Sequence, residues 1–215
     1  MARKAMKRAA KRPAKKAAKR AAATTGRGAS KATARRPAKK AAKKSGRGRA
    51  PSAASQKDLG DLFMETLKDI YHAEKQILRA LPKMAKAAQS SELRQAFQTH
   101  TEQTRGQVDR LEKIFAMSGE RPKAKTCHAI LGLVEEGEEV MEEFKGSDAL
   151  DAGLLAAAQA VEHYEISRYG TLKSWAAQHG MQDVTRLLDE TLAEEKETDE
   201  LLTRIAEGVV NRLAA

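Results

Sequence analysis

The sequence predicts an all-α protein, a four-helix bundle with an extra helix in its crossover, preceded by a disordered basic tail. Apolar residues recur at helical spacing from Ser55 onward, and no segment shows the alternation that is typical of a strand. Gly and Pro residues fall between these periodic segments, where turns are needed. Residues 1–50 carry 20 Lys and Arg residues and no acidic residue. We therefore expect a tail over residues 1–54 and a helical domain over residues 55–215.

Charge is distributed very unevenly along the chain. Residues 1–50 have a formal charge of +20 and residues 51–215 a charge of −9, which together give the net +11. Such an asymmetry is typical of a basic arm that binds a polyanion. The single cysteine, Cys127, excludes an internal disulfide framework and fits a reducing compartment.

Targeting to a membrane is not expected. No apolar run approaches the ~20 residues that a membrane span needs, and no apolar stretch follows the basic N-terminus, so a secretory signal is not indicated. A transit peptide is the nearest alternative, but the tail is rich in Lys and Pro and lacks an amphipathic face. We expect a cytoplasmic, nucleoid-associated protein.

The tail is too polar to fold alone. It has no aromatic residue and almost no large apolar one, so it cannot bury enough apolar surface to offset its chain entropy. Residues 11–20 recur in similar form as residues 35–44. Their Lys-Lys-Ala-Ala units can become helical once phosphates neutralise their charge. The repeats resemble the tails of linker histones and of bacterial histone-like proteins.

Non-specific DNA binding is the function that this tail predicts. Its cations release the counterions of a polyanion, and it has no folded element that could present side chains to base edges. Gly-Arg-Gly units suit a narrow, A·T-rich minor groove, and residues 46–51 look like a loose AT-hook in which Ala50 interrupts the Arg-Pro step. A solvated tail, or one that binds any acidic surface, is the alternative. The expected DNA-contacting residues are Lys11, Arg12, Lys15, Lys16, Arg27, Arg35, Arg36, Lys39, Lys40, Arg47 and Arg49.

The first two predicted helices span residues 56–88 and 91–118. Ser55 is the expected N-cap of the first helix. Gly119 ends the second helix, and Pro122 follows it. The apolar face of the first helix includes Phe63, Leu67, Tyr71, Leu78 and Leu81, and that of the second includes Leu93, Phe97, Leu111, Ile114 and Phe115.

Three more helices are predicted over residues 126–145, 148–178 and 182–212. Their apolar faces include Ile130, Leu131, Val134, Met141 and Phe144 in the shorter helix, Leu154, Val161, Tyr169 and Leu172 in the next, and Val184, Leu188, Ile205 and Val209 in the last. The first two helices and the last two are joined by very short links, so each pair forms an antiparallel hairpin. The connection between the pairs is long enough to cross the bundle. Two hairpins and one crossover make the ferritin-like arrangement.

Polar residues interrupt the apolar faces near the middle of the helices. Glu74 and Gln107 are about equally far from the turn near residue 90, and Glu165 and Glu195 are about equally far from the turn near Gly180. At a rise of about 1.5 Å per residue these positions share one layer, whereas His100 is nearer to its turn. The candidate site residues are Glu74, His100, Gln107, Glu162, Glu165, Glu195 and Asp199.

Such a layer of carboxylates favours a bound cation. A buried, unpaired carboxylate costs several kcal/mol, and the usual solution in a four-helix bundle is a metal pair held by Glu from two helices and Glu-x-x-His from the other two. Oxygen-rich ligation with few imidazoles suits iron or manganese. The chain lacks a clean Glu-x-x-His, so a satisfied polar network, or residues that face solvent or a partner subunit, is the alternative.

Several stretches together resemble the YciF-like family of bacterial ferritin-like stress proteins. They are residues 67–76, 80–83, 156–166, 169–172 and 190–199, and the resemblance covers about residues 58–210. It implies a fold similar to rubrerythrin and ferritin, a homodimer, a role in stress responses and a dinuclear metal site at the candidate residues above. The family usually has Glu where this chain has Gln103, and the basic tail is not a standard part of the family.

Three functions follow from these features. The first is a DNA-associated stress protein whose dinuclear iron or manganese site consumes ferrous iron or peroxide. The second is an architectural protein that coats DNA without metal chemistry. The third is a manganese-catalase-like oxidoreductase for which the tail is only an address. Whether the chain is an enzyme is left open by the sequence, and Cys127 with His128 is expected to be a buried thiol rather than a metal site.

Overall fold

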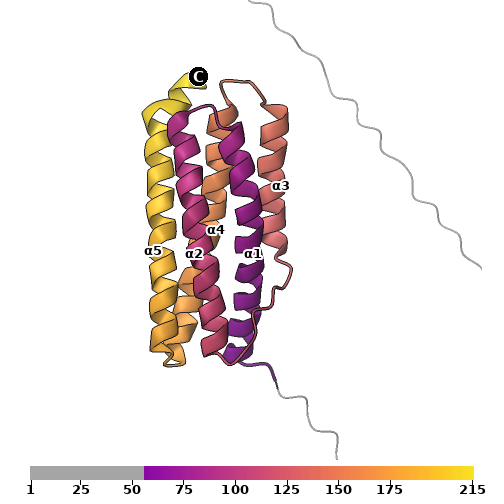
Figure 1. Ribbon diagram of the computed structural model, residues 1–215, viewed down its shortest axis with the longest axis vertical. Coiled ribbons are helices and arrows are strands. Elements are labelled where there is room, and N and C mark those ends of the chain that lie inside the picture. Colours follow the sequence, from indigo (N-terminus) through magenta and orange to yellow (C-terminus); the bar gives the residue numbers. More distant parts are fainter. Residues whose placement is uncertain (1–55) are drawn as a thin grey trace, which may run out of the picture. The chain divides into compact units, whose positions relative to one another are not determined.

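The computed structural model describes residues 56–215 as an all-helical bundle, which confirms the predicted fold class (Figure 1). The helices α1 (Leu59–Ala87) and α2 (Ser91–Met117) form one antiparallel hairpin, and α4 (Leu150–Gln178) and α5 (Gln182–Ile205) form the other. The shorter α3 (His128–Glu143) lies in the crossover and packs on α1 and α4. The predicted tail lies outside the described residues, and the boundary expected at residues 54 and 55 lies at their edge.

The beginning of α1 differs from the prediction. The helix begins at Leu59 rather than at residue 56, and its N-cap is Asp58 rather than Ser55. The Asp58 carboxylate accepts the backbone N–H of Asp61 at 2.9 Å, and the Asp61 carboxylate accepts the backbone N–H of Asp58 at 3.1 Å. This reciprocal capping box satisfies two otherwise unpaired donors, and a negative charge at a helix N-terminus is also favourable.

A glycine follows α2 and another follows α4, where the chain leaves each helix. Gly119 follows α2 with φ of 73°, and Gly180 follows α4 with φ of 68°. Residues with a side chain rarely adopt this left-handed conformation. The residues after them close the turns, because Glu120 N donates to Phe115 O at 2.9 Å and Met181 N donates to Ala176 O at 3.0 Å.

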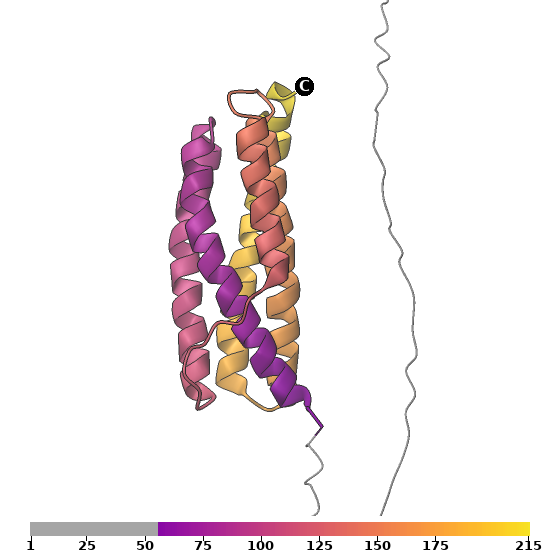
Figure 2. The ribbon, with the colours of Figure 1, turned by 90° about the vertical axis from the view of Figure 1, so that its right-hand side faces the viewer.

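The crossover segment, residues 119–127, runs over the lower half of α1 and leads the chain to the far side of that helix (Figure 2). The contact is anchored where Lys125 N donates to Lys68 O at 3.0 Å. Cys127 then caps α3, since its buried Sγ accepts the N–H of Ile130 at 3.5 Å and lies 2.9 Å from Tyr164 Oη. The expected buried thiol is therefore confirmed.

One carboxylate joins the two hairpins at the end of the bundle that carries the turn between α1 and α2. Asp151, near the start of α4, is buried, and its two oxygens accept the backbone N–H groups of Gln89 at 2.8 Å and Ser90 at 2.6 Å. These donors belong to the turn between α1 and α2. These two hydrogen bonds therefore fix the position of the first hairpin along the bundle axis relative to the second hairpin. Any site formed between the two hairpins depends on this alignment.

The core follows the predicted apolar faces with four exceptions. Ile77 rather than Leu78 is fully buried in α1, while Leu131 and Phe144 of the crossover helix are exposed. In the last helix Val210 is buried instead of Val209. The reason is the π-helical turn η1 (Ala206–Val210), which adds a residue to the turn and shifts the face before α6 (Asn211–Leu213) begins.

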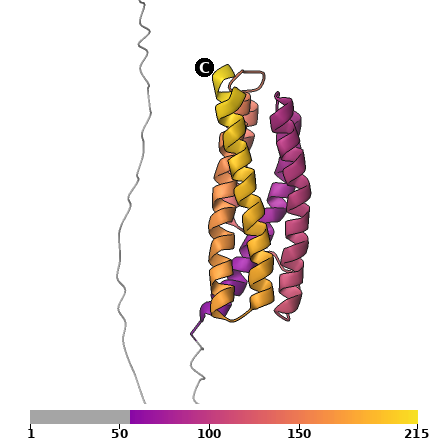
Figure 3. The same cartoon turned by 90° about the vertical axis from the view of Figure 1, so that its left-hand side faces the viewer.

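The side view shows α4 and α5 lying together over most of their length, with α2 beside α5 (Figure 3). The bundle thus has four long helices around one axis and α3 as an outer layer on α1 and α4. Within residues 56–215, no helix is both long enough and apolar enough to cross a bilayer.

The contact of Asp151 with the turn predicts a measurable loss of stability. Replacing Asp151→Ala leaves two buried backbone donors without their acceptor, which we expect to lower the free energy of unfolding by about 1–3 kcal/mol. The measurement is urea unfolding followed by circular dichroism. Asp148→Ala, at an exposed position just before α4, is the matched control and should change stability by less than about 0.5 kcal/mol. Equal stabilities of the two variants would contradict the role given to Asp151.

Candidate metal centre

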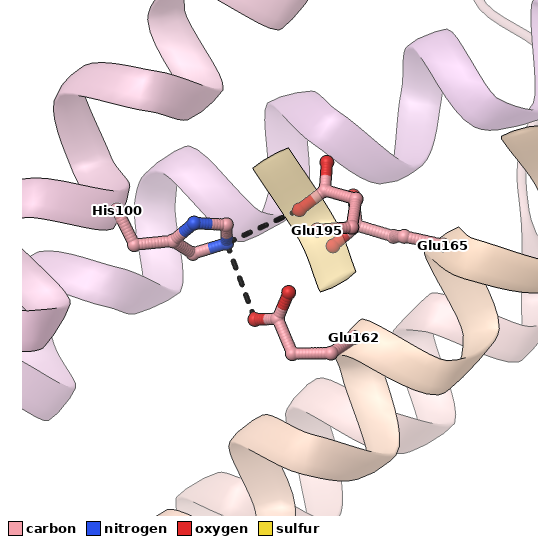
Figure 4. A group of neighbouring side chains, drawn as sticks. All are labelled: His100, Glu162, Glu165 and Glu195. Carbon is pink, nitrogen blue, oxygen red and sulfur yellow. Dashed lines mark ion pairs between the residues drawn. The ribbon is translucent and has the colours of Figure 1, made fainter. Parts of the chain in front are cut away.

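Side chains from four helices meet in the middle of the bundle. His100 comes from α2, Glu162 and Glu165 from α4, and Glu195 from α5, and one ligand atom of each lies within 4.8 Å of the others (Figure 4). Glu74 of α1 lies beside this group, with its carboxyl group within hydrogen-bonding reach of that of Glu165. All five side chains are almost completely removed from solvent. We call these five residues the carboxylate cluster.

The orientation of the His100 ring is set by α5. His100 Nδ1 lies 3.4 Å from the hydroxyl oxygen of Thr198, and that hydroxyl donates its proton to the carbonyl oxygen of Glu194 at 3.0 Å. The Thr198 oxygen can therefore only accept from the ring, which places the imidazole proton on Nδ1. The lone pair of Nε2 then faces the carboxylates, as it does in metal-binding histidines.

Neighbouring atoms in the cluster repel one another unless something positive lies between them. His100 Nε2 is 3.2 Å from Glu162 Oε1 and 4.0 Å from Glu195 Oε2 (Figure 4). A nitrogen lone pair and an ionised carboxylate at this distance require a proton or a cation. The arrangement can therefore take up either.

Unpaired polar atoms are concentrated in this one place. Among residues 56–215, eight buried side-chain nitrogen and oxygen atoms have no hydrogen-bond partner. Buried polar atoms are nearly always paired, so such a concentration needs an explanation. The eight atoms are Glu74 Oε2, His100 Nε2, Gln107 Oε1, Glu162 Oε2, both oxygens of Glu165 and both oxygens of Glu195.

Burial shifts the acid–base behaviour of the cluster strongly. It raises the pKa of Glu74 to about 7 and that of Glu162 to about 8. Burial and the neighbouring carboxylates raise the pKa of Glu165 and of Glu195 well above the ordinary value. Burial also lowers the pKa of His100 to about 4, so the ring is neutral at physiological pH. Without a cation, the cluster holds protons that a cation would displace.

Two further side chains contact the cluster or its neighbours on the side nearer to the turn between α4 and α5. Tyr169, one turn after Glu165 on α4, is fully buried and donates its hydroxyl to Glu74 Oε1. Gln107 donates its amide to Glu194 Oε2 at 3.2 Å, and Arg110 forms an ion pair with the same carboxylate. The Gln107 nitrogen is engaged by Glu194, and its Oε1 is buried without a hydrogen-bond partner.

The donor set fits a hard or borderline divalent cation. It offers four carboxylates, one neutral imidazole and one amide oxygen, with no thiolate. Carboxylate-rich sites with few imidazoles suit iron and manganese. The unpaired atoms and the fixed tautomer of His100 are the observations that support this fit.

The structure brings together five of the seven residues predicted for the site, namely His100, Glu162, Glu165 and Glu195 with Glu74 beside them. Asp199 is not among them, since its carboxylate accepts from Gln159 Nε2 at 3.1 Å and lies 3.3 Å from His163 Nε2. It is half-buried at the edge of the α4–α5 contact. His163 is exposed, as expected from its place off the apolar face.

The depth of His100 was misjudged because the two reference turns lie at opposite ends of the bundle (Figure 1). Counted from the upper end, His100 in α2 and Glu162 in α4 are at similar heights, which is why they meet. Counting each hairpin from its own turn hides this relation for residues away from the helix midpoints.

Two contributing residues were missed by sequence reasoning. Thr198 lies three residues after Glu195, where a Glu-x-x-His motif would place its histidine, and that spacing was the available signal. Tyr169 was assigned only to the apolar face of its helix. The predicted DNA-contacting residues between Lys11 and Arg49 lie outside the described residues, so the structure says nothing of them.

Comparisons with known proteins agree with the fold and with the predicted resemblance. Residues 58–215 match the family described as a domain of unknown function (DUF892). Protein YciF of Escherichia coli strain K12 is 45% identical over 161 residues, which cover 74% of this chain and 97% of that protein. The crystal structure of the E. coli stress protein YciF has a TM-score of 0.70 at 46% identity, covering 73% of this chain and 99% of that one.

Two further solved structures are similar. YcfI from Rhodopseudomonas palustris has a TM-score of 0.67 at 42% identity, covering 70% of this chain and 96% of that one. A protein from Xanthomonas campestris has a TM-score of 0.57 at 23% identity, covering 72% and 94% of the two chains, and this likeness concerns the fold alone.

The raised pKa values predict how the stability of the metal-free protein depends on pH. Near pH 6.5, folded Glu74 and Glu162 hold protons that the unfolded chain has lost, since their ordinary pKa is 4.5, and they release these protons as the pH passes about 7 and about 8. The folded state binds more protons, so the free energy of unfolding should fall as pH rises, by up to about 1.4 kcal/mol per pH unit for each such proton. Urea unfolding in the presence of a chelator measures this slope.

Glu162→Gln provides the specific test of that slope. It removes one of the titrating groups and should flatten the pH dependence, while Glu136→Gln, at an exposed position on α3, should leave it unchanged. A stability that is constant from pH 6.5 to 8 in the unmodified protein would contradict the protonated cluster.

Proposed function

The chain belongs to the DUF892 family, and from this premise we propose that it is a DNA-associated stress-response protein with a dinuclear iron or manganese site in its bundle. The observation that carries the proposal is the cluster of His100, Glu162, Glu165 and Glu195, whose ligand atoms lie within 4.8 Å of one another. The stress role is supported by the E. coli relative, which is described as a stress protein.

His100, Glu162, Glu165 and Glu195 would hold the first cation, and Glu74 with Gln107 would complete the set for a second. Bound iron or manganese supplies one-electron redox chemistry, which suits oxidation of ferrous iron or consumption of peroxide. The chain's own groups prepare the site. Thr198 holds His100 in the tautomer that exposes Nε2, and Tyr169 orients Glu74.

The surroundings of the cluster shield it from bulk solvent. The ligand residues are at most 2% exposed, and apolar side chains such as Leu67, Ile70 and Leu192 belong to the surrounding core. In such a medium a fixed charge or dipole acts more strongly than in water. The ion pair of Arg110 with Glu194 keeps one cation close to four carboxylates.

DNA is the partner that we propose for the tail. Residues 1–50 carry 20 cations, whereas the bundle side of the chain has a charge of −9 and would be repelled by phosphates. The tail would therefore hold the bundle near DNA without fixing it to a sequence. We also propose a homodimer as the assembly, from the family resemblance.

Metal content tests the bundle part of the proposal. The full-length protein, reconstituted with ferrous iron or with manganese, should bind about two ions per chain. Replacing Glu195→Gln removes a charged ligand and should weaken binding at least about tenfold. Glu197→Gln, on the opposite face of the same helix, is exposed and should bind like the unmodified protein. The measurements are elemental analysis after dialysis and ferrous iron oxidation followed by absorbance.

The absence of binding by a folded, reconstituted protein would refute the metal site. The cluster would then be a network of shared protons, and an architectural role on DNA would remain. Binding of manganese together with peroxide turnover that is independent of DNA would instead favour a manganese-catalase-like enzyme.

Salt dependence tests the tail. Replacing four tail lysines, Lys15, Lys16, Lys39 and Lys40, by Gln should reduce the slope of log affinity against log salt concentration by roughly 3 to 4, because each phosphate contact contributes about 0.9. Fluorescence anisotropy with a random-sequence duplex measures this slope. The matched control replaces Lys86, Lys113, Lys145 and Lys196, which are exposed on the bundle, and should leave the slope unchanged. An equal effect of both sets would contradict a role specific to the tail.

A further inference from the structure

An apolar hollow lies between α1, α3 and α4 and reaches the carboxylate cluster. It has a volume of about 30 Å³. Its inner wall includes His100 and Glu162, and its outer rim includes Lys83 and Glu138. Between these ends the lining is aliphatic or thioether, with Met84, Val134 and Met141 among its residues.

The inner end of the hollow carries unpaired polar atoms. His100 Nε2 and Glu162 Oε2 are buried without a hydrogen-bond partner, and both residues line the hollow. A molecule in the hollow therefore lies against two residues of the candidate metal centre. The hollow is part of the same functional region rather than a packing defect elsewhere in the core.

An exposed ion pair lies at the outer rim of the hollow. Lys83 Nζ lies 2.7 Å from Glu138 Oε1, and the two side chains are 59% and 49% exposed. Ion pairs at this exposure contribute little to stability because water screens them. The side chains can separate readily, which gives a small molecule a way in from solvent.

A glycine keeps the hollow open. Gly137 is buried in the middle of α3 and lines the hollow, yet a Cβ placed on it would be 3.7 Å from Ala157 Cβ, an ordinary contact. Alanine would fit there and would favour the helix. Packing of the backbone therefore does not require glycine, whereas a longer side chain would enter the hollow.

We propose that this hollow binds a small uncharged molecule of the size of dioxygen and delivers it to the carboxylate cluster. The inference rests on the proposed function, since it names the class of oxidant that the metal centre would receive. An apolar lining opposes ions, which would lose their hydration without a partner. Hydrogen peroxide would also lose hydrogen bonds there, so dioxygen is favoured.

Xenon provides a probe of the hollow that needs no metal. Dry apolar cavities bind xenon. In the full-length, metal-free protein, xenon should shift the methyl NMR signals of Met84, Met141 and Val161, which line the hollow, and leave that of Val184, elsewhere in the core, unchanged. Shifts confined to Val184, or no shifts at all, would overturn the proposal.

Two matched variants on α3 locate the site. Gly137→Leu should fill the hollow and abolish the xenon shifts, whereas Gly132→Leu, at an exposed position with nothing within 4 Å of its Cβ, should preserve them. Ala157→Leu fills the hollow from the opposite wall and serves if Gly137→Leu does not fold. Xenon binding that survives both filling substitutions would show that the hollow is not the binding site.

Turnover of the metal-loaded protein separates this inference from the proposed function. With dioxygen as oxidant, kcat/KM for dioxygen should fall about tenfold in Gly137→Leu and stay unchanged in Gly132→Leu, with equal metal content in both. Equal kcat/KM values in the two variants would refute delivery through the hollow while leaving the metal site intact. Xenon binding in a protein that takes up no metal would refute the proposed function and leave the hollow as a binding site.

Discussion

The burial of four carboxylates and one imidazole in a single layer is the constraint on which the rest of this bundle depends. Ionised carboxylates at such depth cost free energy. For this reason the pKa values of the four buried carboxyl groups are raised, and these groups keep their protons to a higher pH than usual; they are Glu74, Glu162, Glu165 and Glu195. The packing around them does not remove the problem, because seven of their nitrogen and oxygen atoms remain unpaired. Protons or a cation would satisfy them. The protons that the cluster retains make the stability of the folded chain depend on pH.

The surrounding structure holds this layer in one arrangement. Asp151 joins the turn of the first hairpin to the start of α4, which sets the relative height of the two hairpins. Thr198 then selects the imidazole tautomer, and Tyr169 and Gln107 approach the layer from below. The α3 helix covers α1 and α4 on one side, and the apolar hollow lies at that contact. The residues that fix the geometry of the layer lie on α4 and α5, whereas the hollow proposed as its route of access lies beside α3.

The basic and acidic residues of the chain lie in different segments, and a different function is proposed for each segment. The basic residues of the tail suit a polyanion, whereas the acidic bundle has its carboxylate cluster buried inside. The bundle has apolar residues at helical spacing, and the tail has almost no large apolar residues. The two parts can therefore be told apart from the amino-acid sequence. A reading of composition alone therefore separates them, even though it cannot show how the buried groups meet.

The sequence by itself determined the helices, the two hairpins, the crossover and the presence of polar residues on the apolar faces, because periodicity places a residue relative to the axis of its own helix. It could not determine which of those residues meet. His100 joins the cluster and Asp199 turns to His163 and Gln159 because the heights and rotations of neighbouring helices follow from packing contacts distant in the chain. The cap at Asp58, the π-helical shift at Val210 and the hollow beside Gly137 also arise from contacts rather than from periodicity. Tertiary structure alone decided these features, since each depends on which surfaces face one another.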